Sequence, residues 1–222
     1  MFFDNMIPST RSQFASGRRA NTFYRRYGKR TLDIAVVLAS LPIFLPIIAI
    51  VAGLVALDGG KPFYLQDRIG RRGRVFKLLK IRTMVPNADE RLEQHLSADP
   101  AARAEWDATQ KLKNDPRIIP IGRFLRRSSL DELPQLLNVL MGHMSVVGPR
   151  PMMCCQRTLY PGTDYYLLFP GITGNWQISD RHETKFATRA RYDSEYMSTQ
   201  SLGTDLGIMM QTVRVVLRGT GV

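Results

Sequence analysis

The chain has 222 residues, 44% of them hydrophobic, and Lys and Arg outnumber Asp and Glu by 31 to 19. This length and composition predict one folded domain with an ordinary core. The net charge of +12 indicates an anionic partner, which can be nucleic acid, acidic lipid or a phosphorylated substrate. Cys154 and Cys155 are neighbours, so we expect no disulfide framework.

Residues 1–28 combine polar residues, scattered aromatic residues and an excess of Arg over acidic residues. This composition predicts a flexible basic arm. Such an arm is attracted to anionic lipid, by about 1 kcal/mol for each basic residue near the surface. The apolar run that follows begins late and is not followed by a cleavage site of small residues, so we do not expect a signal peptide.

The segment Ile34–Leu57 carries no charge and, as a helix, is long enough to cross roughly 30 Å of hydrocarbon. A spanning helix is therefore the default interpretation. However, Pro42 and Pro46 lie in its middle, where proline favours a kink. Both flanks are also basic, which favours the cytoplasmic side for each. We expect residues 29–58 to form a re-entrant helix that breaks at Pro46, followed by a cytoplasmic domain over residues 59–222.

The remaining segments predict an α+β fold that is mostly helical and contains a small sheet. Residues 61–84 indicate a short hairpin that turns through Gly70–Gly73. Asn87–Lys113 predicts a charged surface helix anchored by Trp106. The tail Asp205–Gly219 has apolar residues at helical spacing, so it either packs on the core or lies in a membrane interface.

Two adjacent carboxylates, Asp131 and Glu132, lie at the centre of the long motif Gly122–Pro151. Arg126 precedes them, and Arg150 follows in a rigid Gly-Pro-Arg-Pro turn. This combination suits phosphate chemistry. A carboxylate can hold Mg²⁺, an arginine can clamp phosphate oxygens, and a free aspartate can attack phosphorus.

The local sequence gives two interpretations of where the carboxylates sit. Ser129 is a candidate N-cap, and Glu132 follows at capping-box spacing, which places Asp131 in a first turn that favours anions. Pro134 fits poorly inside that helix, which favours a start nearer Leu133. An Asp-Glu pair at a helix start is also often no more than a cap.

The strings RRSSLDELPQLLNVL and GHMSVVGPRP resemble the bacterial sugar transferase family, the small monotopic phosphoglycosyl transferases that start glycan assembly on a polyprenol carrier. The blocks QDRIGRRGRVFKLLKIRTM and PGITGNWQISDRH extend the resemblance over roughly Lys29 to the C-terminus. It implies that Asp131 is the nucleophile and that Glu132 and Asp131 hold Mg²⁺. It also implies substrate or phosphate contacts from Lys80, Arg82, Arg126, Arg150, Arg181 and Asp193. From the residues alone, Lys80 and Arg82 fit a solvated basic strand edge equally well. Arg181 and Asp193, taken alone, fit surface ion pairs better than an active site.

Three residues depart from the family pattern. Leu45 replaces a serine before Pro46, and Asp180 and His182 replace the usual glycine and asparagine. The loop around Asp180 is expected to survive, because Asp tolerates positive φ better than most residues.

The implied reaction moves a hexose 1-phosphate from a UDP-sugar to polyprenyl (undecaprenyl) phosphate through a phosphosugar–Asp131 intermediate and releases UMP. This reaction starts exopolysaccharide or glycoconjugate assembly, on the cytoplasmic face of the bacterial inner membrane. The alternative is a non-catalytic basic protein that binds a membrane surface or nucleic acid. The long apolar run argues against a nucleic-acid binder, and the sequence leaves the sugar and the oligomeric state open.

Overall fold

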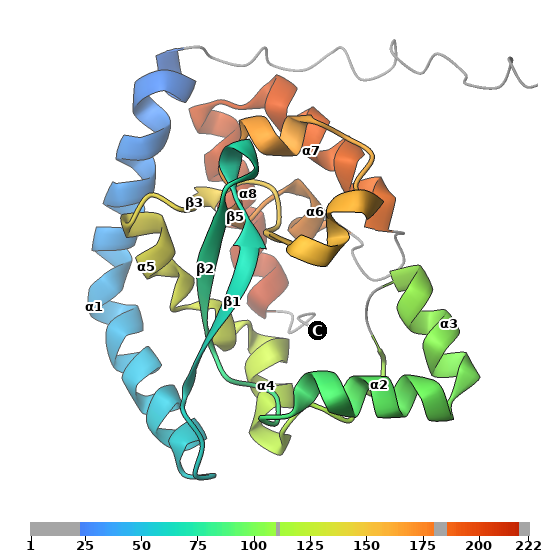
Figure 1. The fold of residues 1–222 in the computed structure, drawn as a ribbon. Helices are drawn as coiled ribbons and strands as arrows, with labels where there is room; N and C mark the ends of the chain where they lie inside the picture. Colours follow the sequence, from blue (N-terminus) through green and yellow to red (C-terminus); the bar gives the residue numbers. More distant parts are fainter. Residues whose placement is uncertain (1–22, 110–111, 180–185, 218–222) are drawn as a thin grey trace, which may run out of the picture.

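Helices form most of the described chain, and two small sheets lie among them (Figure 1), which confirms the predicted α+β fold. The computed structural model describes residues 23–109, 112–179 and 186–217. The helices and strands are, in chain order, α1 (Lys29–Ala56), β1 (Phe63–Ile69), β2 (Val75–Ile81), α2 (Ala88–Ala98), α3 (Pro100–Thr109), α4 (Pro120–Ser128), α5 (Gln135–Leu140), β3 (Ser145–Val147), β4 (Met152–Met153), β5 (Gly171–Thr173), α6 (Asn175–Ile178), α7 (Arg189–Thr199) and α8 (Leu202–Leu217).

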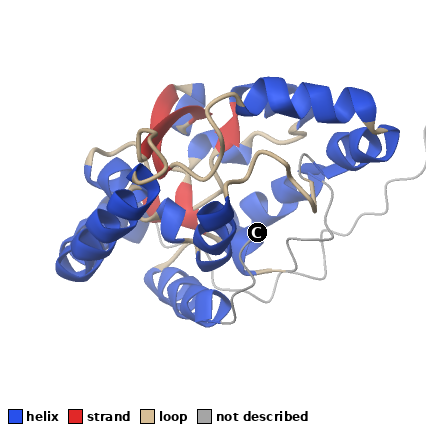
Figure 2. Cartoon of the chain, turned by 90° about the horizontal axis from the view of Figure 1, so that it is seen from below, coloured by secondary structure: helices blue, strands red, loops and turns tan. Residues whose placement is uncertain are grey.

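β1 and β2 form an antiparallel hairpin in which Phe63 lies opposite Ile81 and Ile69 lies opposite Val75. The chain reverses through Gly70–Gly73, so the predicted hairpin is confirmed. β4 pairs with the other edge of β1, and β3 and β5 form a separate parallel pair. Seen from below, helices lie on either side of the strands (Figure 2).

α1 continues as one helix through both prolines, so the predicted break at Pro46 is wrong. Each proline removes a single hydrogen bond, which can bend a helix without ending it. Packing also holds the helix on both sides of the prolines, because Val37 and Val55 are fully buried against the domain. By its length and composition alone, the helical segment Tyr24–Ala56 is long enough and apolar enough to cross a membrane.

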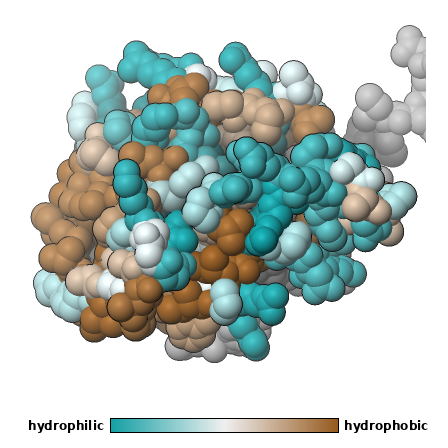
Figure 3. Space-filling view, turned by 60° about the horizontal axis from the view of Figure 1, so that its bottom comes forward, coloured by the Kyte–Doolittle hydropathy of each residue, from teal (hydrophilic) through white to brown (hydrophobic). Residues whose placement is uncertain are grey.

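The domain covers one face of α1 along most of its length. Val37 packs in a core cluster with Leu78 and Val139, and Val51 packs in another with Ile81. The opposite face exposes large apolar side chains, and Figure 3 shows this hydrophobic surface on the side of the molecule that α1 occupies in Figure 1. The large apolar residues that α1 exposes are Ile34, Leu38, Ile43, Leu45, Ile50 and Leu54.

A buried polar network fixes the start of α1. Lys29 Nζ lies 2.8 Å from Asp205 Oδ2 of α8 and 3.3 Å from Asp33 Oδ1. Asp33 Oδ1 also accepts hydrogen bonds from the Ser145 hydroxyl (2.9 Å) and from the Val146 amide (3.0 Å). Lys29 therefore neutralises buried carboxylates.

α8 packs on the core through Ile208, which is 4% exposed and contacts Val147 and Tyr196. This confirms the core-packing alternative for the tail. Several apolar residues of the same helix are nevertheless on the surface, among them Leu206 and Met210. The helix therefore also presents an apolar outer face.

The helical stretch expected over Asn87–Lys113 is divided into α2 and α3. Asp99 ends α2, and its carboxylate accepts a hydrogen bond from the Ala101 amide at 2.9 Å, while Pro100 occupies a start position that proline tolerates. The two helices pack on each other around Leu96 and project from the rest of the domain (Figure 1).

Candidate active site

Three glycines bring the backbone of the Gly148–Pro151 turn against β5. A Cβ atom at Gly148 would lie 2.2 Å from the Phe169 carbonyl oxygen, and one at Gly171 or Gly174 would lie 2.1 Å from backbone atoms of Gly148. No side chain fits such gaps, because real Cβ contacts are essentially never that short. The close approach fixes the turn, and the turn positions Arg150.

The two carboxylates lie in a tight 3₁₀ turn, Leu130–Glu132, between α4 and α5. Ser129 ends α4 with a φ of 58° and makes no side-chain cap bond, so the predicted capping box is wrong. α5 begins only at Gln135, immediately after Pro134. The proline ring and missing N–H explain this late start, and Asp131 therefore does not lie in the first turn of α5.

Lys80 connects the two carboxylates. Its Nζ lies 2.8 Å from Glu132 Oε1 and 3.6 Å from Asp131 Oδ2. Arg150 approaches the same Glu132 oxygen from the other side, with Nη2 at 3.1 Å. Asp131 is only 5% exposed, so the site holds a buried carboxylate beside one that two cations neutralise.

The surroundings separate the proton affinities of the two acids. Burial raises the pKa of Asp131, and the charge of Glu132 adds to this, while Lys80 and Arg126 oppose it. Burial would also raise the pKa of Glu132, but Lys80 and Arg150 outweigh it and hold that pKa well below its usual range. Glu132 is therefore the permanently charged member, and Asp131 is the one that depends on nearby cations to ionise.

Lys80 and Arg150 contact the carboxylates directly, and the charge of Arg126 acts to lower the pKa of Asp131. Arg126 donates from Nε to the Thr83 hydroxyl at 2.9 Å, which holds the guanidinium beside Asp131. The structure thus brings together five of the residues that the sequence analysis selected, from β2, α4, the 3₁₀ turn and the glycine-rich turn.

Arg82 lies apart from this cluster, so its predicted phosphate contact is not supported by its position. It donates to the Val55 carbonyl at 3.1 Å and to the Lys61 carbonyl at 2.9 Å, and it pairs with Asp58. Arg82 therefore binds carbonyl groups at the end of α1. Arg181, like Asp180 and His182, lies outside the described residues.

Asp193 lines a small cavity that Arg150 also lines, and this cavity contains neither member of the Asp131–Glu132 dyad. Its Oδ2 accepts a hydrogen bond from the Tyr160 hydroxyl at 2.6 Å. Burial raises the pKa of Asp193 to about 7, although Tyr160 and Arg189 act against this. The cavity is lined by Arg150, Met152, Tyr160, Tyr165, Trp176, Phe186, Arg189 and Asp193.

Comparison with known proteins shows the family of the chain. The model of the bacterial sugar transferase family matches residues 24–219. The chain belongs to this family. It is 49% identical over 198 residues to a UDP-galactose-lipid carrier transferase of Erwinia amylovora, covering 88% of this chain and 42% of that protein. It is 46% identical over 198 residues to an undecaprenyl-phosphate galactose phosphotransferase of Salmonella typhimurium, again covering 42% of that protein.

The chain thus spans about two fifths of the length of these two relatives. A shorter relative, the exopolysaccharide production protein ExoY of Rhizobium meliloti, is 44% identical over 196 residues, which cover 87% of both chains.

Sequence reasoning missed two arginines of the site. Arg68 lines the cavity that contains Lys80 and Glu132, and its Nη1 donates to the Pro151 carbonyl at 3.0 Å. Arg189 lines the other cavity. Arg68 stands inside the QDRIG block that carried part of the family resemblance, so that block was its signal. Nothing in the sequence near Arg189 separated it from its basic neighbours.

Asn138 is a third missed residue, and it acts through the backbone. Its amide Nδ2 donates to the Lys77 carbonyl at 2.8 Å, and its Oδ1 accepts from the Leu79 amide at 2.9 Å. Because both groups belong to β2 and shortly precede Lys80, the fully buried side chain of Asn138 holds the Lys80 strand against the helix that follows the carboxylates.

The donor set of the site fits Mg²⁺ in one particular way. Among the described residues, no group of three or more His, Cys, Asp or Glu side chains could hold a metal ion. Asp131 and Glu132 are two adjacent carboxylates, and Mg²⁺ commonly binds one or two carboxylates together with water and substrate phosphates. The residues therefore suit a magnesium ion that is bound jointly with a phosphorylated substrate.

Proposed function

We propose that this protein transfers a sugar 1-phosphate from a UDP-sugar to undecaprenyl phosphate, or a similar polyprenyl phosphate, at the cytoplasmic face of the bacterial inner membrane. The observation that carries the proposal is the buried Asp131 beside Glu132, with Lys80 in contact with both carboxylates. The names of the relatives support the donor and the acceptor, and the exposed apolar face of α1 supports attachment to a membrane.

In the first step, a carboxylate oxygen of Asp131 attacks the phosphorus that bears the sugar. An O–P bond to Asp131 forms while the P–O bond to the nucleotide breaks, and UMP leaves with the electron pair. In the second step, an oxygen of the lipid phosphate attacks the same phosphorus and restores the Asp131 carboxylate. Phosphoryl transfer of this kind depends mainly on positioning and on charge stabilisation.

The surrounding residues have distinct tasks in this scheme. Lys80 and Arg126 favour the ionised form of Asp131 that attack requires. Arg150 contacts Glu132 at 3.1 Å and offers further N–H donors to phosphate oxygens. Glu132 and Asp131 are the residues that would hold Mg²⁺, which supplies positive charge to the phosphates when it is bound.

The first prediction concerns the nucleophile. Asp131→Asn should lower turnover by at least about 10³-fold, because a neutral amide cannot form the acyl phosphate. Glu132→Gln should also be severely impaired, and raised Mg²⁺ should recover activity in this variant only. UMP release from UDP-sugars in the presence of polyprenyl phosphate measures both effects, and Asp67→Asn on the exposed surface of β1 is the control.

Trapping provides the direct test of the covalent step. A donor labelled in its sugar is mixed with enzyme, quenched rapidly, and the peptide that contains Asp131 is weighed by mass spectrometry. A phosphosugar adduct on Asp131 is the expected result. Full activity in a folded Asp131→Asn variant would refute the mechanism and leave direct attack by the lipid phosphate, or a non-catalytic role.

A further inference from the structure

Arg150 lines two small cavities at once. The first cavity also contains Glu132 and Arg68, and the second contains Arg189 and Asp193. The dyad side and the Asp193 side of the site are therefore joined through one guanidinium group. A ligand with two linked anionic groups could contact both sides.

Arg150 and Arg189 approach the same aromatic ring. The guanidinium carbon of Arg189 lies 4.1 Å from the ring centre of Trp176, and that of Arg150 lies 5.9 Å from it. Arg189 also lies 4.6 Å from the ring centre of Phe186. Rings hold a cation in place without neutralising its charge, so both guanidinium groups keep the capacity to bind an anion.

Arg68 and Arg189 each have an unused hydrogen-bond donor. The Nε atoms of both side chains are buried, and neither has a partner among the described residues. A buried donor without an acceptor is costly, and the cost disappears when an acceptor arrives. Phosphate oxygens match the fixed fork of an arginine in geometry and charge.

The positive charges of this region are poorly compensated. Burial, followed by repulsion from Arg150, lowers the pKa of Arg68 to about 10 and that of Arg189 to about 9. The acid among the described residues lining the second cavity is Asp193, whose pKa burial raises to about 7, so near neutral pH it is only partly charged. An incoming anion would relieve the repulsion between the arginines.

We propose that Arg68, Arg150 and Arg189 form a second phosphate subsite, which holds the phosphate of the departing nucleoside monophosphate. This inference rests on the proposed function. The phosphate under attack lies at Asp131, and the phosphate of the nucleotide is joined to it by the P–O bond that breaks. As that bond breaks, its electron pair passes to the nucleotide phosphate, whose negative charge grows. Arginines placed beyond the dyad stabilise that charge.

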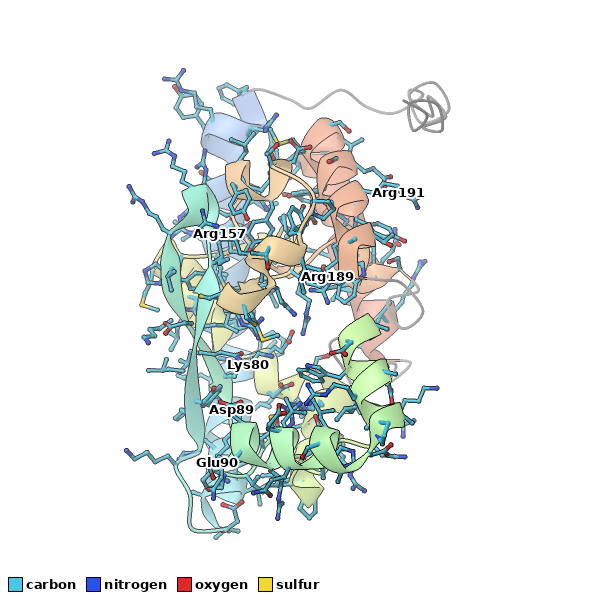
Figure 4. All side chains as sticks on the ribbon, turned by 45° about the vertical axis from the view of Figure 1, so that its right-hand side comes forward. Lys80, Asp89, Glu90, Arg157, Arg189 and Arg191 are labelled. Carbon is cyan, nitrogen blue, oxygen red and sulfur yellow. The ribbon has the colours of Figure 1, made fainter. Side chains whose placement is uncertain are left out.

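The test compares two arginines of one helix. Figure 4 shows Arg191 on the outer side of α7, whereas Arg189 extends from the same helix toward the centre of the molecule. Arg189→Gln should weaken the binding of UMP by about tenfold or more. It should leave the binding of hexose 1-phosphate unchanged, and Arg191→Gln should change neither. Calorimetric titration of the detergent-solubilised full chain measures both ligands.

Two results would overturn the subsite: unchanged UMP binding in folded Arg189→Gln, or an equal loss for UMP and hexose 1-phosphate. Arg189→Lys and Arg68→Gln extend the comparison if Arg189→Gln does not fold. Arg189→Lys keeps the positive charge but loses the planar set of N–H donors, whereas Arg68→Gln loses both at its position. The UMP affinity of Arg189→Lys should therefore lie between those of wild type and Arg68→Gln. Wild-type protein that binds UMP through Arg189 but never releases UMP from a UDP-sugar would contradict the proposed function and leave the subsite standing.

Discussion

Asn138 joins the strand of Lys80 to the helix that follows the carboxylates, through one amide donor and one amide acceptor. Asn138→Asp keeps the shape, removes the donor and places a charge in a fully buried position. We expect the free energy of unfolding to fall by about 1–3 kcal/mol. We also expect kcat to fall more than KM rises, because Lys80 would no longer be held against the carboxylates.

Denaturant unfolding and steady-state kinetics measure these two effects, with Asn87→Asp, at an exposed position, as the control. A variant that loses stability but keeps the wild-type kcat would assign Asn138 a structural role only.

The raised pKa of Asp193 predicts a pH dependence of stability. The folded protein holds this proton up to about pH 7, whereas an unfolded chain releases it near pH 4. Between these values the folded state binds more protons, so the stability contribution is fully present below about pH 4 and is lost as the pH rises through about 7. The slope approaches about 1.4 kcal/mol per pH unit.

Asp193→Asn cannot titrate and should lack this loss. Unfolding of wild type and variant from pH 5 to pH 8 should therefore show the variant gaining stability relative to wild type as the pH rises. Asp89→Asn, on the surface of α2 (Figure 4), should run parallel to wild type. Parallel curves for wild type and Asp193→Asn would contradict the burial argument.

Single residues were predictable where the sequence grouped them. Asp131, Glu132 and Arg150 stand within one motif, and the structure keeps them together. Arg82 was misplaced because the end of α1 supplies its partners, and those belong to a distant segment. Arg189 was missed for the same reason, since its importance comes from Arg150 and a cavity wall built by several segments.

At the scale of elements, local signals decided what could be predicted. The β1–β2 hairpin follows from glycines that end one strand and begin the next, and such a turn needs no distant contact. Two expectations about helix ends were wrong. The sequence predicted a break at Pro46, but α1 packs on the domain and continues past this residue. The sequence also predicted a helix cap at Ser129, but this residue adopts left-handed backbone geometry. The continuation of α1 past Pro46 depends on tertiary contacts that a local pattern does not contain.

At the scale of the whole molecule, the packing of α1 restricts how the chain can meet a membrane. Val37 and Val55, near opposite ends of α1, are both buried against the domain. A helix that crossed the bilayer in this arrangement would draw the polar domain into hydrocarbon, at a prohibitive cost. We therefore expect both ends of α1 to remain on the cytoplasmic side, with its apolar outer face in the lipid.

Cysteine labelling tests this sidedness. Cys154 and Cys155 are exposed, so both are first replaced by serine. Single cysteines then replace Phe23 and Lys61, which are exposed on either side of α1. In sealed vesicles, both positions should react with an impermeant reagent from the cytoplasmic side. Reaction of the two from opposite sides would contradict this arrangement and support a spanning helix.

The buried network at the start of α1 also sets an order of events during synthesis. Tyr24 donates a hydrogen bond to Asp205, which lies 181 positions later in the chain. A ribosome needs roughly 10–40 s to cover that distance. For most of this interval the residues of α1 have been made, but the carboxylate that binds Tyr24 and Lys29 has not. The contacts of Tyr24 and Lys29 with Asp205 therefore form only when the chain is almost complete, and a chain stalled before Asp205 would lack them.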